Sequence, residues 1–176
     1  MKILVTGAGG LIGSAVVVKY ASEGHTLVGI ENDSRRQFFG AAATVKPNVA
    51  RLVEAFPLFT CHSLDVRDGP EIRALLLAER PDVVIHCAAQ PSHDLSAQMP
   101  VEDFTVNALA TATLLEATRA ANPEAVFVFL STNKVYGDAP NERRFVETAT
   151  RYDYADARER DGIDETCRID RTTHSP

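Results

Sequence analysis

A glycine-rich turn near the N-terminus constrains this 176-residue chain more than any other feature. The chain begins KILVTGAGGLIG, so a short apolar run is followed by Gly7, Gly10 and Gly13 at a spacing of three. An apolar, partly β-branched run of this length is typical of a strand buried on both faces. A helical pattern then covers residues 11 to about 23, and a second apolar strand covers residues 26–30.

This order of strand, glycine turn, helix and strand favours a binding site for a pyrophosphate. Glycine permits both the tight turn and the close approach of the phosphates to the backbone. The N-terminus of the following helix offers unpaired N–H groups and a partial positive charge. The sequence therefore predicts that a dinucleotide binds at a short set of residues: Gly7, Gly10, Leu11, Ile12 and Gly13.

An acidic residue, Glu31, ends the second strand roughly 20 residues beyond the turn, where a carboxylate hydrogen-bonds the adenosine ribose. We place Asn32 beside it and Arg35 within reach of the cofactor. Arg35 and Arg36 are open to three interpretations: they meet a 2′-phosphate, they meet the diphosphate or a substrate phosphate, or they are solvated. Because Glu31 would repel a 2′-phosphate, NAD is favoured over NADP.

The rest of the chain alternates further apolar strands with helical patterns. Strands are expected at residues 57–64, 82–87 and 125–131, and helices at 48–56, 68–79 and 100–121. This alternation predicts an α/β fold, a Rossmann-like doubly wound parallel sheet of five strands. Ligands of such sheets bind at the C-terminal strand ends. The further candidates for cofactor binding all follow strand ends or interrupt a helix: Asp65, Val66, Ala88, Ala89, Gln90, Asn107 and Ser131.

Several polar residues also have plainer interpretations. Asp65 either accepts the adenine amino group or only caps the next helix. His86 is interpreted as a structural, hydrogen-bonded residue, and Asn107 meets backbone near the cofactor or only a neighbouring loop. His93 and Asp94 form a His–Asp pair, but no nucleophile-elbow serine accompanies them to complete a catalytic triad. We therefore expect them only in a loop that faces substrate. Loop is also expected for the stretch just after Glu31.

Composition limits the classes of partner. The formal net charge of −6 gives no reason to expect nucleic acid or an anionic membrane surface as a partner. No stretch is long enough to cross a bilayer, and the three cysteines lack metal-ligand spacing, so we expect a cytoplasmic protein without a metal. The apolar pattern fades late in the chain, which predicts a cofactor-binding domain at 1–137 and a charged, mostly irregular segment at 138–176.

The chain resembles the extended short-chain dehydrogenase/reductases, within the NAD-dependent epimerase/dehydratase family. The segments that carry the resemblance are TGAGGLIG, HCAAQPSHD, DFTVNA and STNKVYGDAPN. Within the family, the chain most resembles the CDP-paratose 2-epimerase subgroup. It implies NAD as cofactor and a nucleotide sugar, a CDP-linked deoxysugar, as substrate.

The resemblance also implies residue roles. The family's catalytic hydroxyl lies four residues before the tyrosine of VYG, which is Thr132 before Tyr136 here, with Ser131 as its neighbour. Its hydroxyl would hydrogen-bond the sugar oxygen that becomes a carbonyl during transient hydride transfer. His93, Asn133 and Lys134 would contact substrate. The alternative for Lys134 is an exposed lysine with no role in binding. Related dehydratases carry Thr-Asp-Glu where this chain has Thr132-Asn133-Lys134, so epimerisation is favoured over dehydration.

One departure from the family is clear. The family's YxxxK helix supplies the general base, but none of Tyr20, Tyr136, Tyr152 and Tyr154 has a lysine four residues on. We therefore expect the N-terminal half of such an enzyme, truncated and without its substrate domain, that binds NAD with little or no turnover. The alternatives are a non-catalytic dinucleotide-binding module and an NAD(P)-dependent nucleotide-sugar dehydratase or reductase. An uncovered last strand would favour self-association.

Overall fold

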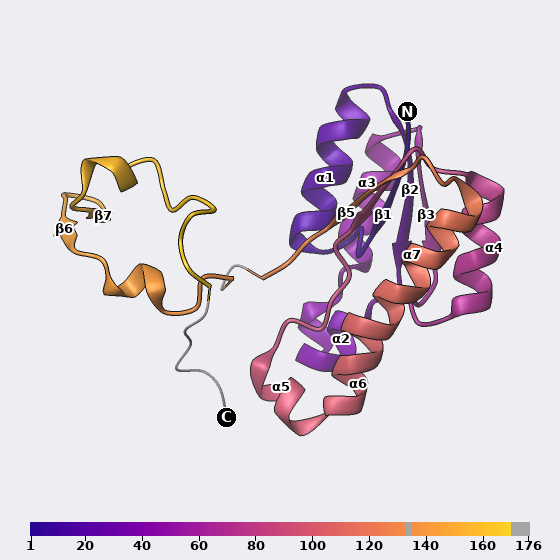
Figure 1. Ribbon diagram of the computed structural model, residues 1–176. Coiled ribbons are helices and arrows are strands. Elements are labelled where there is room, and N and C mark those ends of the chain that lie inside the picture. The colour runs from indigo at the N-terminus through magenta and orange to yellow at the C-terminus, as the bar shows by residue number, and fades with distance from the viewer. Residues whose placement is uncertain (133–134, 170–176) are drawn as a thin grey trace. The chain divides into compact units, whose positions relative to one another are not determined.

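The computed structural model describes residues 1–132 and 135–169, and the chain divides into two compact units, Met1–Leu130 and Ser131–Pro176. The first unit holds a five-stranded parallel sheet of order β3-β2-β1-β4-β5 (Figure 1). The strands are β1 (Lys2–Thr6), β2 (Thr26–Glu31), β3 (Phe59–Ser63), β4 (Val83–His86) and β5 (Val126–Phe129). This is the doubly wound parallel sheet that the alternating pattern predicts, and that prediction is confirmed.

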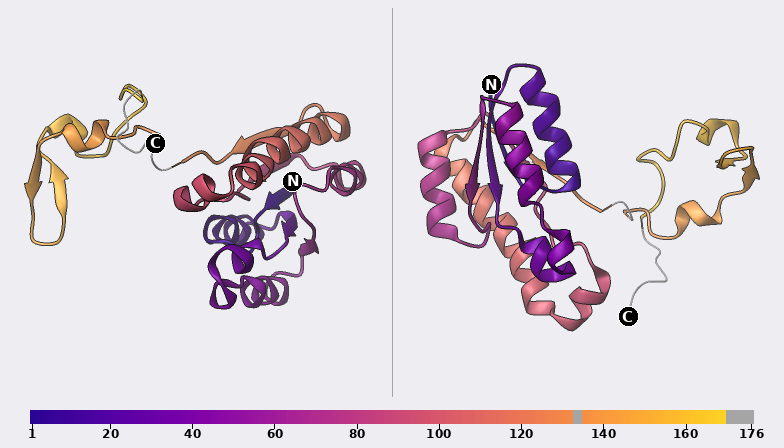
Figure 2. Two further views of the ribbon diagram at one scale, coloured as in Figure 1. Left: turned by 90° about the horizontal axis from the view of Figure 1, so that it is seen from below. Right: turned by 180° about the vertical axis from the view of Figure 1, so that it is seen from behind.

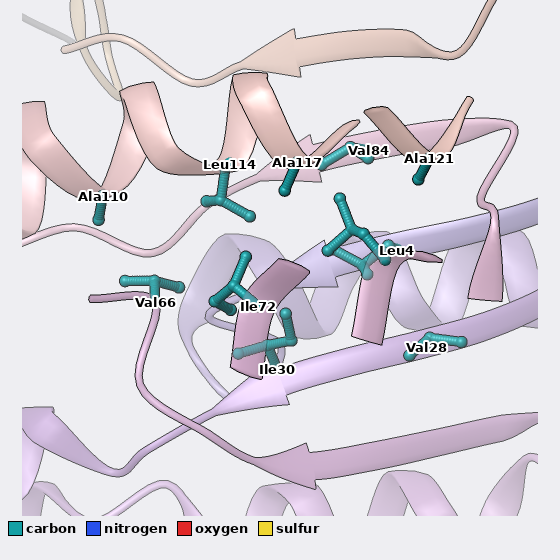
Figure 3. Close-up of a cluster of buried hydrophobic side chains, with 11 residues drawn as sticks. Leu4, Val28, Ile30, Val66, Ile72, Val84, Ala110, Leu114, Ala117 and Ala121 are labelled. Atoms are coloured by element: carbon teal, nitrogen blue, oxygen red, sulfur yellow. The ribbon is translucent and has the colours of Figure 1, made fainter. Parts of the chain in front are cut away.

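Helices cover both faces of this sheet (Figures 1 and 2). The principal helices are α1 (Leu11–Ser22), α3 (Lys46–Ala55), α4 (Gly69–Glu79) and α7 (Ala110–Ala121). On one face, Val17 of α1 and Leu52 of α3 pack with the strands. On the other face, a second cluster joins Leu4 of β1 to Ile72 of α4 and Leu114 of α7 (Figure 3). Burial on both faces explains why β1, β2 and β4 are apolar almost throughout.

Two short helices occupy stretches for which a loop was predicted. The first, α2 (Ser34–Phe39), directly follows β2, and the second, α5 (His93–Gln98), follows β4. Each has only six residues, too short for an apolar periodicity to be recognised. Ser92 caps α5 by accepting the N–H of Leu95 at 3.3 Å. The loop predictions were wrong for both segments, and α2 brings further side chains to the sheet edge.

The long helix predicted at residues 100–121 is interrupted. It consists of α6 (Pro100–Phe104), a π-helical turn at Thr105–Leu109, and α7. A π turn adds a residue to the helical repeat and rotates the preceding face. Val106 in this turn is buried, whereas Phe104 before it and Leu109 at its end are exposed by 61% and 53%.

Strand β5 forms one edge of the sheet. It pairs only with β4 among the described strands, and Val126, Val128 and Phe129 are exposed. The expectation of self-association rests on this edge, since an unpaired strand edge offers backbone N–H and C=O groups to another chain. Among the described helices, none combines the length and apolarity that a bilayer crossing requires.

The second unit has little regular structure. Its antiparallel pair, β6 (Phe145–Glu147) and β7 (Tyr152–Tyr154), is flanked by 3-10 turns at Ala139–Glu142 and Ala157–Glu159. The rings of Phe145 and Tyr154 lie 5.1 Å apart across the pair, and Arg143 forms an ion pair with Glu159 at 3.0 Å. The predicted irregular segment thus contains one short hairpin.

Adjacent leucines on α7 provide a test of this packing. Leu114 is fully buried between α7 and the sheet, whereas Leu115 is 45% exposed. We expect Leu114→Ala to lower the free energy of unfolding by about 2–5 kcal/mol, because it removes buried apolar contacts and leaves a cavity. Leu115→Ala should cost roughly 1 kcal/mol or less. Urea denaturation of both variants checks this, and equal losses would contradict the packing.

Candidate dinucleotide-binding site

A cavity of about 260 Å³ lies at the C-terminal edge of the sheet, where the segments after β1, β2, β3 and β4 converge. Twelve of the residues predicted from the sequence to contact the cofactor line this cavity. They are Gly7, Gly10, Leu11, Ile12, Gly13, Glu31, Asn32, Arg35, Asp65, Val66, Ala88 and Ala89. The convergence follows from the topology, because parallel strands direct their C-terminal ends to one side of the sheet.

The glycine turn brings helix α1 very close to the end of β1. A Cβ atom on Gly13 would lie 2.1 Å from the carbonyl oxygen of Gly7, so no other residue fits there. Gly7 has a φ of +63°, in the left-handed region that favours glycine. A Cβ on Gly7 would also lie 3.0 Å from the backbone of Ala88. These two glycines therefore let the turn pack against both the helix and the loop after β4.

The start of α1 leaves backbone donors free. Within the described part of the chain, no hydrogen bond occupies the N–H groups of Leu11, Ile12 and Gly13, and the first helical bond runs from Ser14 N–H to the Gly10 carbonyl at 2.9 Å. All three residues line the cavity. Unpaired N–H groups at the start of a helix, together with the positive end of its dipole, form an anion-binding site.

Glu31 stands at the end of β2, and its carboxylate is held by backbone donors. Its Oε2 accepts the N–H of Gly9 at 3.1 Å, and its Oε1 accepts the N–H of Asp33 at 2.9 Å. Each carboxylate oxygen can accept a further hydrogen bond. The side chain is therefore fixed beside the glycine turn and still able to accept bonds from a ligand's hydroxyl groups.

Asp65, after β3, is engaged by neighbouring side chains. Arg67 binds it through two N–H groups, at 2.9 and 2.7 Å, and Asn32 donates to it at 2.8 Å. Hydrogen bonds from Arg67 hold the pKa of Asp65 below its ordinary value. The alternative in which Asp65 caps the next helix is wrong, because Asp68 caps α4 through the N–H of Glu71.

Helix α2 contributes residues that sequence reasoning missed. Ser34, Phe38 and Phe39 line the cavity, and the Arg35 guanidinium lies over the Phe39 ring at 5.1 Å from its centroid. The aromatic pair in SRRQFF was an available signal, but the stretch was interpreted as a loop. Arg36 instead lines a second hollow next to Glu31.

The structural interpretation of His86 is confirmed, since its two ring nitrogens bond to Thr6 and Thr111. Thr6 Oγ1 accepts the N–H groups of Cys87 and Ala88, so its hydroxyl proton goes to His86 Nδ1, 2.6 Å away. His86 therefore carries its proton on Nε2 and donates to Thr111 Oγ1 at 3.1 Å, and Thr111 donates onward to the Asn107 carbonyl at 2.7 Å. Burial lowers the pKa of His86 to about 4, so the ring is neutral at pH 7.

Gln90 and Asn107 are near the cavity but do not line it. Asn107 accepts the Gln90 N–H at 2.9 Å and donates to the Gln90 carbonyl at 3.0 Å. The buried Gln90 side chain donates to Ser96 Oγ and to Asp103 Oδ1. The two amides hold the loop after β4 against α5 and α6, which is the plainer of the two interpretations offered for Asn107.

Of the residues predicted to contact substrate, only His93 is described, and it is not among those that line the cavity. His93 is the exposed first residue of α5, and Ser131 and Thr132 begin the second unit. Asn133 and Lys134 lie outside the described residues. Cys87 does line the cavity, but burial raises its pKa to about 11, which keeps the thiol protonated at neutral pH and excludes it as a ready nucleophile.

Sheet order, glycine turn and cavity together define a Rossmann-like fold. The sequence profile described as "NAD dependent epimerase/dehydratase family" matches residues 3–159, and the chain belongs to that family. It is 33% identical over 176 residues to the CDP-paratose 2-epimerase of Salmonella typhi, an alignment that covers 100% of this chain and 48% of that protein.

Two further relatives have similar sequences or structures. The UDP-glucose 4-epimerase of Mycolicibacterium smegmatis is 34% identical over 140 residues, covering 80% of this chain and 42% of that protein. The Thermus thermophilus UDP-glucose 4-epimerase, solved as a complex with NAD, superposes with a TM-score of 0.66 and 32% identity over 84% of this chain and 43% of that chain. The chain thus spans about half the length of these two curated relatives.

His86 makes stability depend on pH. Its pKa is about 4 in the folded chain against an ordinary 6.5, so between these values the unfolded chain binds more protons. The free energy of unfolding therefore falls as pH drops from the ordinary pKa toward 4. The loss through His86 amounts to about 3 kcal/mol in total, and above the ordinary pKa there is no loss. Urea denaturation from pH 7.5 to 4.5 should show this slope in the wild type and a smaller slope in His86→Gln. His62→Gln, at an exposed position on β3, is the control, and an unchanged slope in His86→Gln would contradict the assignment.

Proposed function

We propose that the cavity at the sheet edge binds NAD and that the chain provides the NAD-binding part of a nucleotide-sugar epimerase. One observation carries the proposal. Leu11, Ile12 and Gly13, whose N–H groups have no hydrogen-bond partner in the described part of the chain, line the same cavity as Glu31. The first group suits a pyrophosphate, and the second suits the hydroxyl groups of a ribose.

The lining residues fit a dinucleotide in shape as well as in polarity. Because Gly7, Gly10 and Gly13 carry no side chains, phosphates can approach the backbone of the turn. Leu64, Val66 and Phe38 add apolar surface near Glu31 that suits an adenine ring. The family's dependence on NAD and the NAD complex of the Thermus thermophilus relative support the same cofactor.

For the substrate, we propose a CDP-linked deoxysugar that is epimerised at C2. The support is the Salmonella typhi CDP-paratose 2-epimerase, whose sequence aligns with all 176 residues of this chain. When bound, NAD supplies reversible redox chemistry at the sugar carbon. Thr132 would hydrogen-bond the reacting oxygen with Ser131 beside it, and His93, Asn133 and Lys134 would contact the sugar nucleotide. These roles are proposals on the family pattern.

We propose further that this chain alone binds NAD with little or no turnover, because no tyrosine in its 176 residues is followed by a lysine four positions later. With CDP-paratose and NAD, the rate should be at least about 100-fold below that of a full-length relative, since a missing general base costs about 100-fold to 10,000-fold. Chromatography of the CDP-sugars measures the rate. Epimerisation at the rate of the full-length relative would contradict this proposal, because it would show that another residue of this chain acts as the general base.

A second candidate is a dehydratase or reductase that uses NADP. Arg36 and Lys46 line a hollow of about 570 Å³ next to Glu31, and Arg35 lines the main cavity, so cations stand near the expected ribose position. Glu31 opposes this candidate, because its carboxylate would repel a 2′-phosphate. A non-catalytic dinucleotide-binding module is the third alternative.

We also propose a reducing cytoplasmic location, since Cys61, Cys87 and Cys167 are free thiols.

Substitution of Glu31 separates NAD from NADP. Glu31→Ala should weaken NAD binding by about 10-fold or more and raise the ratio of NADP to NAD affinity, because the ribose acceptor and the repulsive charge are both removed. If Glu31→Ala acted only by loosening the glycine turn, the affinities for NAD and NADP would both fall and their ratio would stay unchanged. Glu54→Ala, which removes the same charge from an exposed position on α3, is the matched control. Isothermal titration calorimetry gives both constants, and tighter binding of NADP than NAD by the wild type would overturn the choice of cofactor.

A further inference from the structure

Helix α3 and Val45, the residue before it, pack against the glycine turn. A Cβ atom on Gly9 would lie 2.8 Å from Val49 and 2.9 Å from Val45, so the turn rests directly on these side chains. The Asn48 side chain donates from Nδ2 to the Gly9 carbonyl oxygen at 2.8 Å. Both backbone groups of Gly9 are therefore engaged, the N–H by Glu31 and the carbonyl by Asn48.

The orientation of the Asn48 amide is fixed by a second partner. Arg51, one turn later on α3, donates from Nη2 to Asn48 Oδ1 at 2.7 Å. A guanidinium has only donors, so the oxygen of the amide must face Arg51 and the nitrogen must face Gly9. Asn48 is half-buried, whereas Arg51 is exposed.

The start of α3 is anchored by a buried carboxylate. Asp33 is 7% exposed and accepts the Val45 N–H at 2.8 Å and the Thr44 hydroxyl at 2.8 Å. Asp33 also donates its own N–H to Glu31. A closed chain of contacts thus runs from Glu31 through Asp33 and α3 to Asn48, and from Asn48 through Gly9 back to Glu31.

We propose that Asn48 is a positioning residue for dinucleotide binding, which acts by holding the Gly9 carbonyl away from the phosphates. A glycine peptide rotates easily, and a rotated Gly9–Gly10 peptide would direct a carbonyl oxygen toward the anion. The other end of this peptide is also held, because Gly10 N–H donates to the Gly7 carbonyl at 3.0 Å. The inference rests on the proposed NAD binding and adds a residue outside the cavity lining.

Asn48→Asp provides the sharpest test. An aspartate keeps the shape and the contact with Arg51 but places a carboxylate oxygen against the Gly9 carbonyl. We expect NAD to bind about 10-fold more weakly by calorimetry, a loss of about 1.4 kcal/mol, because the repelled Gly9 carbonyl would rotate toward the phosphates. Asn48→Ala, which removes the donor without repulsion, should lose less affinity. Glu54→Ala, which changes an exposed residue of α3 outside this network, is the control and should bind NAD within about twofold of the wild type.

Spectra of protein labelled with ¹⁵N-glycine provide a readout that does not depend on NAD. In Asn48→Asp the amide signals of Gly9 and Gly10 should move, whereas those of Gly24 and Gly69, which lie elsewhere in the fold, should stay in place. Affinity and glycine signals that both remain at wild-type values would overturn the inference while the proposed function stands. Wild-type protein that binds no NAD would defeat the proposed function, and the glycine signals would then decide whether Asn48 still fixes the turn.

Discussion

The structure depends on the close approach of Gly13 to the carbonyl oxygen of Gly7. A side chain at Gly13 would collide with that oxygen, so only glycine lets α1 begin directly on the end of β1. The first three residues of α1 line the cavity, and their N–H groups are unpaired among the described residues. An anion site with a positive helix end follows from backbone geometry alone.

Side-chain networks hold further strand ends in place around this turn. Thr6 binds the N–H groups after β4, and its hydroxyl fixes His86 as a neutral ring that reaches Thr111 on α7. Asp65 is held by Arg67, which also forms an ion pair with Glu102 of α6. Each strand end thus carries a residue that lines the cavity and a residue that fixes its position.

The sequence predicted the sheet and most of the cavity because both follow from short-range patterns. Apolar strands alternate with helices, and residues at C-terminal strand ends converge whatever the details of the loops. Contacts between distant segments were beyond such reasoning. Nothing in the local sequence shows that Asn48 reaches Gly9, or that Asn107 and Gln90 bond to each other. Helix α2 was missed because it has six residues, and the π turn was missed because apolar spacing alone does not distinguish it from regular helix.

The central claim is that the glycine turn and Glu31 together bind an adenine dinucleotide. A crystal structure of the chain grown with NAD tests it most directly. We expect pyrophosphate oxygens within hydrogen-bonding distance of the N–H groups of Leu11 and Ile12, and ribose hydroxyls on Glu31. A dinucleotide bound elsewhere, or none at a saturating concentration of NAD, would contradict it.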